Sequence, residues 1–171
     1  MKIGIVLERD YPTTPADIRV EKEIWSLQKA GHEPVMLCLQ IDNERPTLDS
    51  YQNLRIRRVN IPMLCIRDWN DRNVASHFES ESSEWVKEIS RFISEENLDA
   101  LHVHDLPLGM ATIISASKRN IPVVLDLHEA YPLLVDFMRG TEDKEWSSVK
   151  WVSSYETECI NGADHLIVTI E

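Results

Sequence analysis

The chain has 171 residues, of which 43% are hydrophobic and 27% charged, which is enough for one globular domain with its own core. Its formal net charge of -11 argues against a general nucleic-acid-binding protein, because such proteins need a basic surface. No signal peptide and no apolar run of roughly 20 residues is visible, so we expect a soluble protein or one held at a membrane surface.

The three cysteines, Cys38, Cys65 and Cys159, are far apart in the sequence and odd in number. They fit no zinc-binding spacing, and they contain no CxxC pair. We therefore predict buried, reduced thiols, which are typical of a cytoplasmic protein.

In chain order, the hydrophobic pattern alternates between strands and helices. Apolar runs predict strands at 2–7, 34–40, 54–61, 99–105, 121–129 and 163–171. Helical periodicity predicts helices at 15–33, 82–98, 108–120 and 146–162. The polar residues 41–53 and the irregular residues 62–77 are expected to be loops. The segment 130–140 has two interpretations, a lid over an acceptor and an ordinary core-packing segment.

Strands that alternate with helices and are apolar on both faces indicate a parallel sheet covered by helices on both sides. We therefore predict that residues 1–171 form a single doubly wound, Rossmann-like α/β domain. In such sheets, ligands bind at the carboxyl ends of the strands, near the point where the strand order reverses.

Two of the predicted strands end in histidines and carboxylates, and this pattern indicates a site. The side chains are His102, His104, Asp105, Asp126, His128 and Glu129. Three interpretations are open: a divalent metal site, because alternate strand residues face the same way; a substrate pocket in which His128 orients a hydroxyl; and structural polar groups whose hydrogen bonds are satisfied internally.

Common cofactor motifs are absent from the sequence. The first strand-to-helix turn, "ERDYPTTPAD", has none of the glycines that let a backbone approach a pyrophosphate, which argues against a dinucleotide-binding enzyme. Neither a GxxxxGK[ST] phosphate loop nor a GxSxG nucleophile elbow occurs.

Three segments together resemble the N-terminal half of family-four glycosyltransferases with the GT-B fold. They are "YPTTPADIRVEKEIWSLQKAGHEPVML", "LDALHVHDLPLGMATIISASKRNIPVVLDLHEAYP" and "YETECINGADHLIVTIE". The resemblance spans nearly the whole chain and is weakest over 41–80. It implies an acceptor-binding domain of a retaining enzyme that takes a sugar from a UDP- or GDP-sugar, without a metal, and passes it to a sugar or glycolipid acceptor.

The resemblance also implies a C-terminal donor-binding domain that is absent from the 171 residues, so we expect this chain alone to be inactive. His128 matches the family histidine that lies in the cleft and touches the transferred sugar, and it is the predicted catalytic residue. His104, Asp105 and Glu129 are expected to line the acceptor side. Arg19 either approaches the diphosphate or acceptor, or pairs with an acid on its own helix. The loop "TTPAD" lacks the glycines that the family often has, so no backbone phosphate contact is expected there.

Two other functional classes are considered. One is a standalone small-ligand-binding or interaction domain without catalysis, and the other is a metal-dependent hydrolase built on the same histidines. The segment 54–77 mixes arginines, among them Arg55, Arg57, Arg58 and Arg67, with apolar residues such as Trp69. It is interpreted either as a peripheral contact with the inner face of the membrane or as a strand followed by a packed loop.

Overall fold

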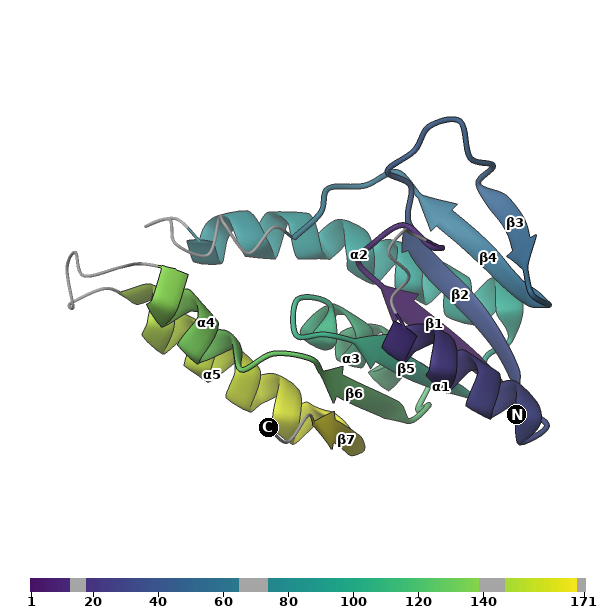
Figure 1. The fold of residues 1–171 in the computed structure, drawn as a ribbon. Helices are drawn as coiled ribbons and strands as arrows, with labels where there is room; N and C mark the ends of the chain where they lie inside the picture. Colours follow the sequence, from purple (N-terminus) through teal and green to yellow (C-terminus); the bar gives the residue numbers. More distant parts are fainter. Residues whose placement is uncertain (13–17, 65–73, 139–146, 169–171) are drawn as a thin grey trace.

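The computed structural model describes residues 1–12, 18–64, 74–138 and 147–168. The strands are β1 (Lys2–Leu7), β2 (Glu33–Leu39), β3 (Leu48–Tyr51), β4 (Leu54–Val59), β5 (Ala100–His104), β6 (Val123–Leu127) and β7 (His165–Val168). The helices are α1 (Ile18–Lys29), α2 (Val74–Glu96), α3 (Gly109–Ser117), α4 (Tyr131–Met138) and α5 (Ser147–Gly162). Figure 1 shows these elements arranged as one sheet with helices around it.

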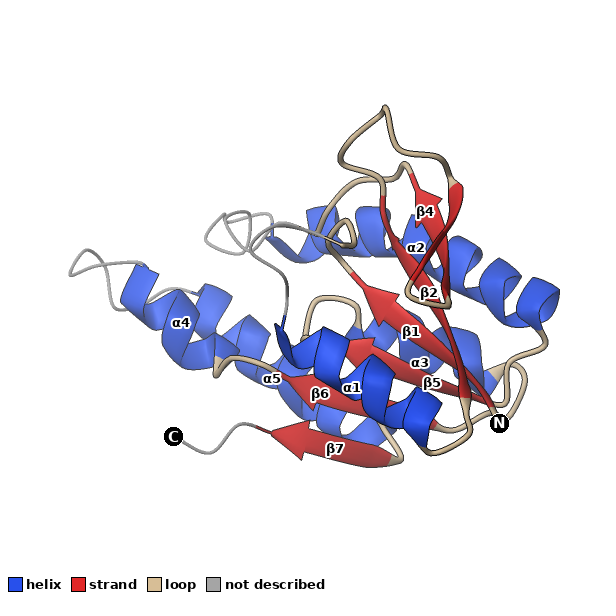
Figure 2. Ribbon diagram, turned by 45° about the vertical axis from the view of Figure 1, so that its right-hand side comes forward, coloured by secondary structure: helices blue, strands red, loops and turns tan. Residues whose placement is uncertain are grey.

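The strands form a seven-stranded sheet in the order β3-β4-β2-β1-β5-β6-β7. Every neighbouring pair is parallel except β3 and β4, which are antiparallel. In Figure 2, α1 lies in front of the sheet, whereas α2, α3 and α5 lie behind it. The predicted doubly wound α/β fold is therefore confirmed. The strand order reverses between β1 and β5, which is where such folds bind ligands.

Alternation along β1 divides the core between the two faces of the sheet. Ile5 belongs to a cluster with Val20 and Ile24 of α1, and Val6 belongs to a cluster on the other face with Trp85 and Phe92 of α2. Successive side chains of a strand point to opposite faces, so a central strand covered by helices on both sides must be apolar throughout.

Three elements differ from the sequence prediction: strand β3, the start of helix α2, and helix α4, which lies in the segment 130–140 where no helix was predicted. Strand β3 lies in the predicted loop 41–53, because its pairing with β4 forms a hairpin that its own polar sequence does not reveal. Gln52 and Asn53 connect the strands with φ of 48° and 64°, and two positive φ values are the geometry that a two-residue hairpin turn requires. Helix α2 begins at Val74 rather than at the predicted residue 82. The sequence did not predict the added residues as helix because they have little apolar periodicity.

The arginines of β4 are paired with acidic side chains. Arg55 Nη2 lies 2.7 Å from Glu96 Oε2, and Arg57 forms an ion pair with Glu95. Arg58 is buried and contacts two carboxylates, at 2.8 and 2.9 Å. These guanidinium groups are therefore engaged within the protein rather than forming a free basic surface. Arg67 and Trp69 lie outside the described residues. Among the helices that the structure describes, none is long and apolar enough to cross a bilayer.

Cys38 and Cys159 are buried free thiols, as predicted, and Cys65 lies outside the described residues. Burial raises the pKa of both thiols to about 12. Neither is therefore a thiolate at neutral pH, and both behave as small apolar side chains.

Candidate functional site

The carboxyl ends of β1, β5 and β6 meet at a cavity of about 400 Å³. Its polar lining comes from residues that directly follow or end these strands, namely Glu8, Arg9, His104, Asp105, His128 and Glu129. Its apolar lining is formed by Leu7, Met63, Leu64, Pro107, Tyr131 and Leu134. The predicted residues His104, Asp105, His128 and Glu129 thus lie together at one cavity, whereas Arg19 does not line it.

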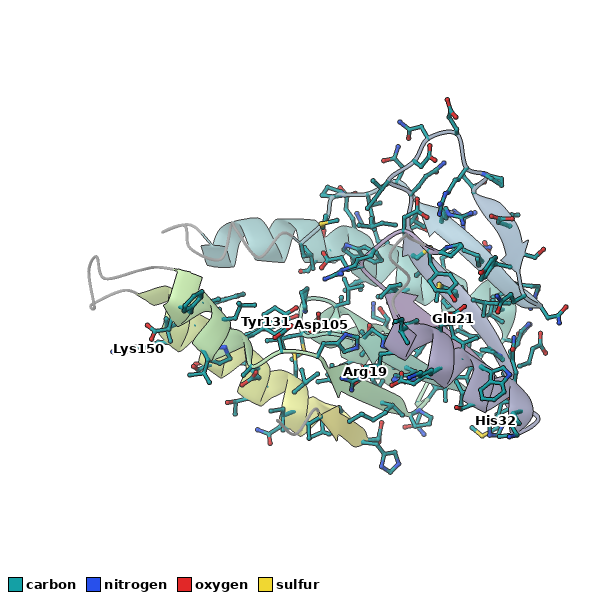
Figure 3. All side chains as sticks on the ribbon, in the orientation of Figure 1. Arg19, Glu21, His32, Asp105, Tyr131 and Lys150 are labelled. Atoms are coloured by element: carbon teal, nitrogen blue, oxygen red, sulfur yellow. The ribbon has the colours of Figure 1, made fainter. Side chains whose placement is uncertain are left out.

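Asp105 follows β5 with a positive φ of 76°, a conformation that aspartate tolerates better than most residues. Its backbone N–H donates a hydrogen bond to the Asp126 carbonyl at 2.7 Å, which ties the end of β5 to β6. Tyr131, the first residue of α4, lies beside Asp105 in Figure 3 and is hydrogen-bonded to it. Burial and the Asp105 charge raise the pKa of Tyr131, which therefore stays a neutral phenol.

The side chains of Asp126 and His104 contact the imidazole of His128. Its Nε2 lies 3.1 Å from Oδ2 of Asp126 and 3.2 Å from Nδ1 of His104. The His128 side chain is 19% exposed, whereas those of His104 and Asp126 are fully buried. Burial alone would lower the pKa of His128, but the hydrogen bond to Asp126 and the charges of Asp105 and Asp126 outweigh it and raise that pKa.

Asp126 is the carboxylate around which the polar groups gather. Burial would raise its pKa, but hydrogen bonds from His104 and His128 and the charge of Arg19 hold it well below its usual range. Asp126 is therefore ionised despite being buried. The register of the sheet explains its position, because Asp126 pairs with His104 across β5 and β6.

Arg19, labelled in Figure 3, lies on α1. It forms an ion pair with the buried Asp126 of β6. Its Nε also donates to Glu23 Oε1 at 3.3 Å, one turn further along the helix. The interpretation of Arg19 as the partner of an acid on its own helix therefore agrees with the structure. A contact with a substrate stays a prediction.

Glu23 faces His102 and His104, with Oε2 at 3.6 Å from Nε2 of each ring. Burial is the main cause that raises the pKa of Glu23. Burial, with the neighbouring histidine, lowers the pKa of His102 to about 3, so this imidazole is neutral at physiological pH.

Sequence reasoning did not single out Glu8, Arg9, Glu23 or Tyr131. Glu8 and Arg9 follow β1 directly, so the rule that drew attention to the ends of β5 and β6 also applied to them. Glu23 offered a weaker signal, its four-residue spacing from Arg19. Which face of α1 turns toward β5 is decided by packing, and no local pattern shows it.

The cavity suits a ligand rich in hydroxyl groups. Its carboxylates accept hydrogen bonds, and imidazole and guanidinium groups donate them. No serine or cysteine occurs among the described residues that line it, so the lining offers neither a hydroxymethyl nor a thiol nucleophile. These features define a doubly wound α/β domain with a polar cavity where the strand order reverses.

The chain belongs to the family described as "Glycosyl transferase 4-like domain", which matches residues 18–171. Among curated proteins, no sequence matches significantly.

Solved structures share the fold at low sequence identity. Sucrose-phosphate synthase from Thermosynechococcus elongatus aligns with a TM-score of 0.73 and 16% identity over 99% of this chain and 42% of its own. UGT2 of Phytolacca americana, solved with UDP-2-fluoro-glucose and pterostilbene, aligns with a TM-score of 0.61 and 10% identity, over 99% and 48%. The chain thus spans less than half the length of either protein, and its fold is that of a GT-B N-terminal domain, as expected.

UDP-GlcNAc 2-epimerase from Methanocaldococcus jannaschii also aligns, with a TM-score of 0.54 and 17% identity over 99% of this chain and 40% of its own. At such identities the likeness shows the fold alone. The same fold therefore occurs in an epimerase, so it does not decide between reactions.

Proposed function

We propose that this chain is the acceptor-side domain of a retaining glycosyltransferase, which moves a sugar from a nucleotide sugar to an acceptor. Membership of the glycosyl transferase 4-like family supports sugar transfer. The observation that carries the proposal is His128, which reaches the cavity while its Nε2 is held by the ionised Asp126.

Each side chain has a proposed role. His128 contacts the sugar being transferred and positions it as positive charge develops at the reacting carbon. Asp105, Glu129 and His104 lie on the acceptor side. Asp105 and Glu129 bind hydroxyl groups of a sugar or glycolipid, whereas the buried His104 contacts His128 and supports its position. Arg19 acts through its ion pair with Asp126, which keeps that carboxylate in place behind His128.

We also propose the donor, the domain that binds it, and the location of the protein. The donor is a UDP- or GDP-sugar, and a second domain holds it, as the 42% coverage of sucrose-phosphate synthase suggests. The transfer step uses no metal ion. A cytoplasmic location, predicted from the reduced thiols, is part of the same proposal.

The test is His128→Ala in the enzyme that carries both domains. We expect kcat/KM to fall by about 100-fold or more, which is typical when a positioned hydrogen-bonding group is removed from a transition state. The variant should unfold at the wild-type temperature, because the ring is partly exposed and leaves no sealed cavity. Steady-state kinetics and a thermal melt provide both readouts.

The matched control is His165→Ala, which removes an exposed imidazole from β7. It should leave kcat/KM unchanged. Wild-type turnover in His128→Ala would remove His128 from the site.

A standalone ligand-binding domain is supported by the same cavity, since binding needs no second domain. The two functions differ in turnover. If the protein bound a sugar at the cavity but never transferred one, with any donor and with all of its natural sequence present, the binding domain would be correct.

A further inference from the structure

Four ionisable side chains lie between α1 and the sheet, behind the cavity. Glu23, His102, His104 and Asp126 offer one potential ligand atom each, and these atoms all lie within 4.8 Å of one another. His102, His104 and Asp126 are 6%, 1% and 0% exposed. Buried groups of this kind need partners, because an unsatisfied polar atom in the interior is costly.

Three atoms of this cluster lack a hydrogen-bond partner among the described residues. They are Oε2 of Glu23 and Nε2 of His102 and of His104. The Glu23 oxygen lies 3.6 Å from each nitrogen, which is beyond hydrogen-bonding distance. The ligand atoms of a tetrahedral zinc site, with bonds of about 2.0–2.2 Å, are about 3.4 Å apart. The observed 3.6 Å between Glu23 Oε2 and each Nε2 is therefore close to the separation of two ligand atoms on one zinc ion, and it is too long for a hydrogen bond.

The opposite atoms of Glu23 and His104 already have partners. Arg19 donates to Oε1 of Glu23 at 3.3 Å and is paired with Oδ1 of Asp126. Asp126 Oδ2 lies 3.4 Å from Nδ1 of His104. An ionised carboxylate beside Nδ1 favours the tautomer with the proton on Nδ1, in which Nε2, 3.6 Å from Glu23 Oε2, carries the lone pair. Such carboxylate–histidine pairs commonly orient the histidine ligands of metal ions.

We propose that Glu23, His102 and His104 bind one divalent cation of the zinc class, with a water molecule as the fourth ligand and Asp126 orienting His104. Two imidazoles and one carboxylate are a ligand set that zinc and its neighbours favour. Because His102 and His104 are buried, a substrate cannot reach the ion, and its role is to cross-link α1 to β5. This departs from the expectation of a protein without metal, but it leaves the transfer step metal-free.

Zn²⁺ titration of the tag-free, chelator-treated chain, followed by calorimetry, tests the proposal. We expect one equivalent to bind and the melting temperature to rise on binding, since the ion binds only the folded state. Glu23→Gln keeps the size of the side chain but removes the anionic ligand, and it should weaken binding by about 100-fold or more. His102→Ala should do the same.

His165→Ala is the matched control, because it removes a histidine from the surface and should keep the wild-type affinity. Co²⁺ gives a second readout that does not depend on stability, since a four-coordinate ion with nitrogen and oxygen ligands absorbs visible light strongly. No saturable Zn²⁺ binding by the wild-type chain, or equal binding by Glu23→Gln and His102→Ala, would overturn the proposal. These results are independent of turnover, so the proposed transferase function stands or falls separately.

Discussion

At the scale of single residues, the pairing of Asp10 with Arg58 shows how a buried charge fixes the loop that follows β1. Arg58 Nε donates to Asp10 Oδ1 at 2.8 Å, and the backbone N–H groups of Ile41 and Asp42 donate to Oδ2 at 3.2 Å. Asp10 and Arg58 are each 3% exposed. Since Glu8 and Arg9 immediately precede Asp10, this network also holds one wall of the cavity.

The same network predicts how stability depends on acid. Burial would raise the pKa of Asp10, but Arg58, the two backbone donors and Arg45 lower it overall. A carboxyl group whose pKa is lower in the folded state stabilises the protein fully above about pH 5, and that contribution is lost as the pH falls below about 4. The free energy of unfolding, measured by urea titration, should therefore decrease over this range.

Asp10→Asn should lower the free energy of unfolding at pH 7 by about 3 kcal/mol, because it leaves the buried Arg58 without its main counter-charge. It should also make the acid dependence shallower. Glu44→Gln, an exposed carboxylate in the same loop region, is the control and should change neither quantity. An acid dependence that is as steep in Asp10→Asn as in the wild type would show that other carboxyl groups cause it.

At the scale of elements, local pattern predicted the strands that contain apolar runs and the helices that have apolar periodicity. The central strands are of the first kind and α1 is of the second, and the spacing of His102 and His104 correctly placed both side chains on one face of β5. Strand β3 depends on its pairing with the neighbouring β4, and the orientation of α1, which brings Glu23 to the histidines, depends on contacts with distant segments. Such contacts leave no periodic signal in a single sequence.

The contact of α2 with β1 depends on a missing side chain at Gly4. A Cβ placed there would lie 2.5 Å from Leu98 Cδ1 and 2.9 Å from Phe92 Cε1. Real carbon atoms do not approach so closely, so a larger residue must displace these buried side chains. Gly4→Ala should therefore lower the free energy of unfolding by about 1–3 kcal/mol, as overpacking of a core typically does.

A double-mutant cycle with Leu98→Ala tests this cause, because it removes the nearest atoms. The loss in Gly4→Ala/Leu98→Ala should be smaller than the sum of the two single losses, as measured by urea unfolding. Gly31→Ala is the contrasting control: with φ of 81° and no neighbour within 4 Å, it should lose about 1 kcal/mol through its backbone alone. Strict additivity for Gly4 and Leu98 would rule out the steric cause.

At the scale of the whole molecule, the negative charge of the protein and of its cavity favours one of the two proposed substrates, the acceptor, over the other, the nucleotide sugar. The chain carries a formal charge of -11. Among the described residues that line the cavity, Arg9 is the one lysine or arginine, and it stands beside Glu8, Asp105 and Glu129. Carboxylates accept hydrogen bonds from sugar hydroxyls but repel a diphosphate. The cavity is therefore suited to an acceptor and unsuited to a nucleotide.

It follows that residues 1–171 alone should neither bind UDP or GDP nor transfer sugar from their sugar derivatives. Calorimetry with both nucleotides should show no saturable binding, and a transfer assay should show no product. The longer protein that includes the proposed donor-binding domain should do both under the same conditions. Cooperative urea unfolding of the shorter chain would establish that the loss is not a failure to fold, since the sheet and both core clusters lie within it. Micromolar binding of UDP or GDP by residues 1–171 would contradict this division of the substrates, because the cavity would then hold the anionic donor despite its carboxylates.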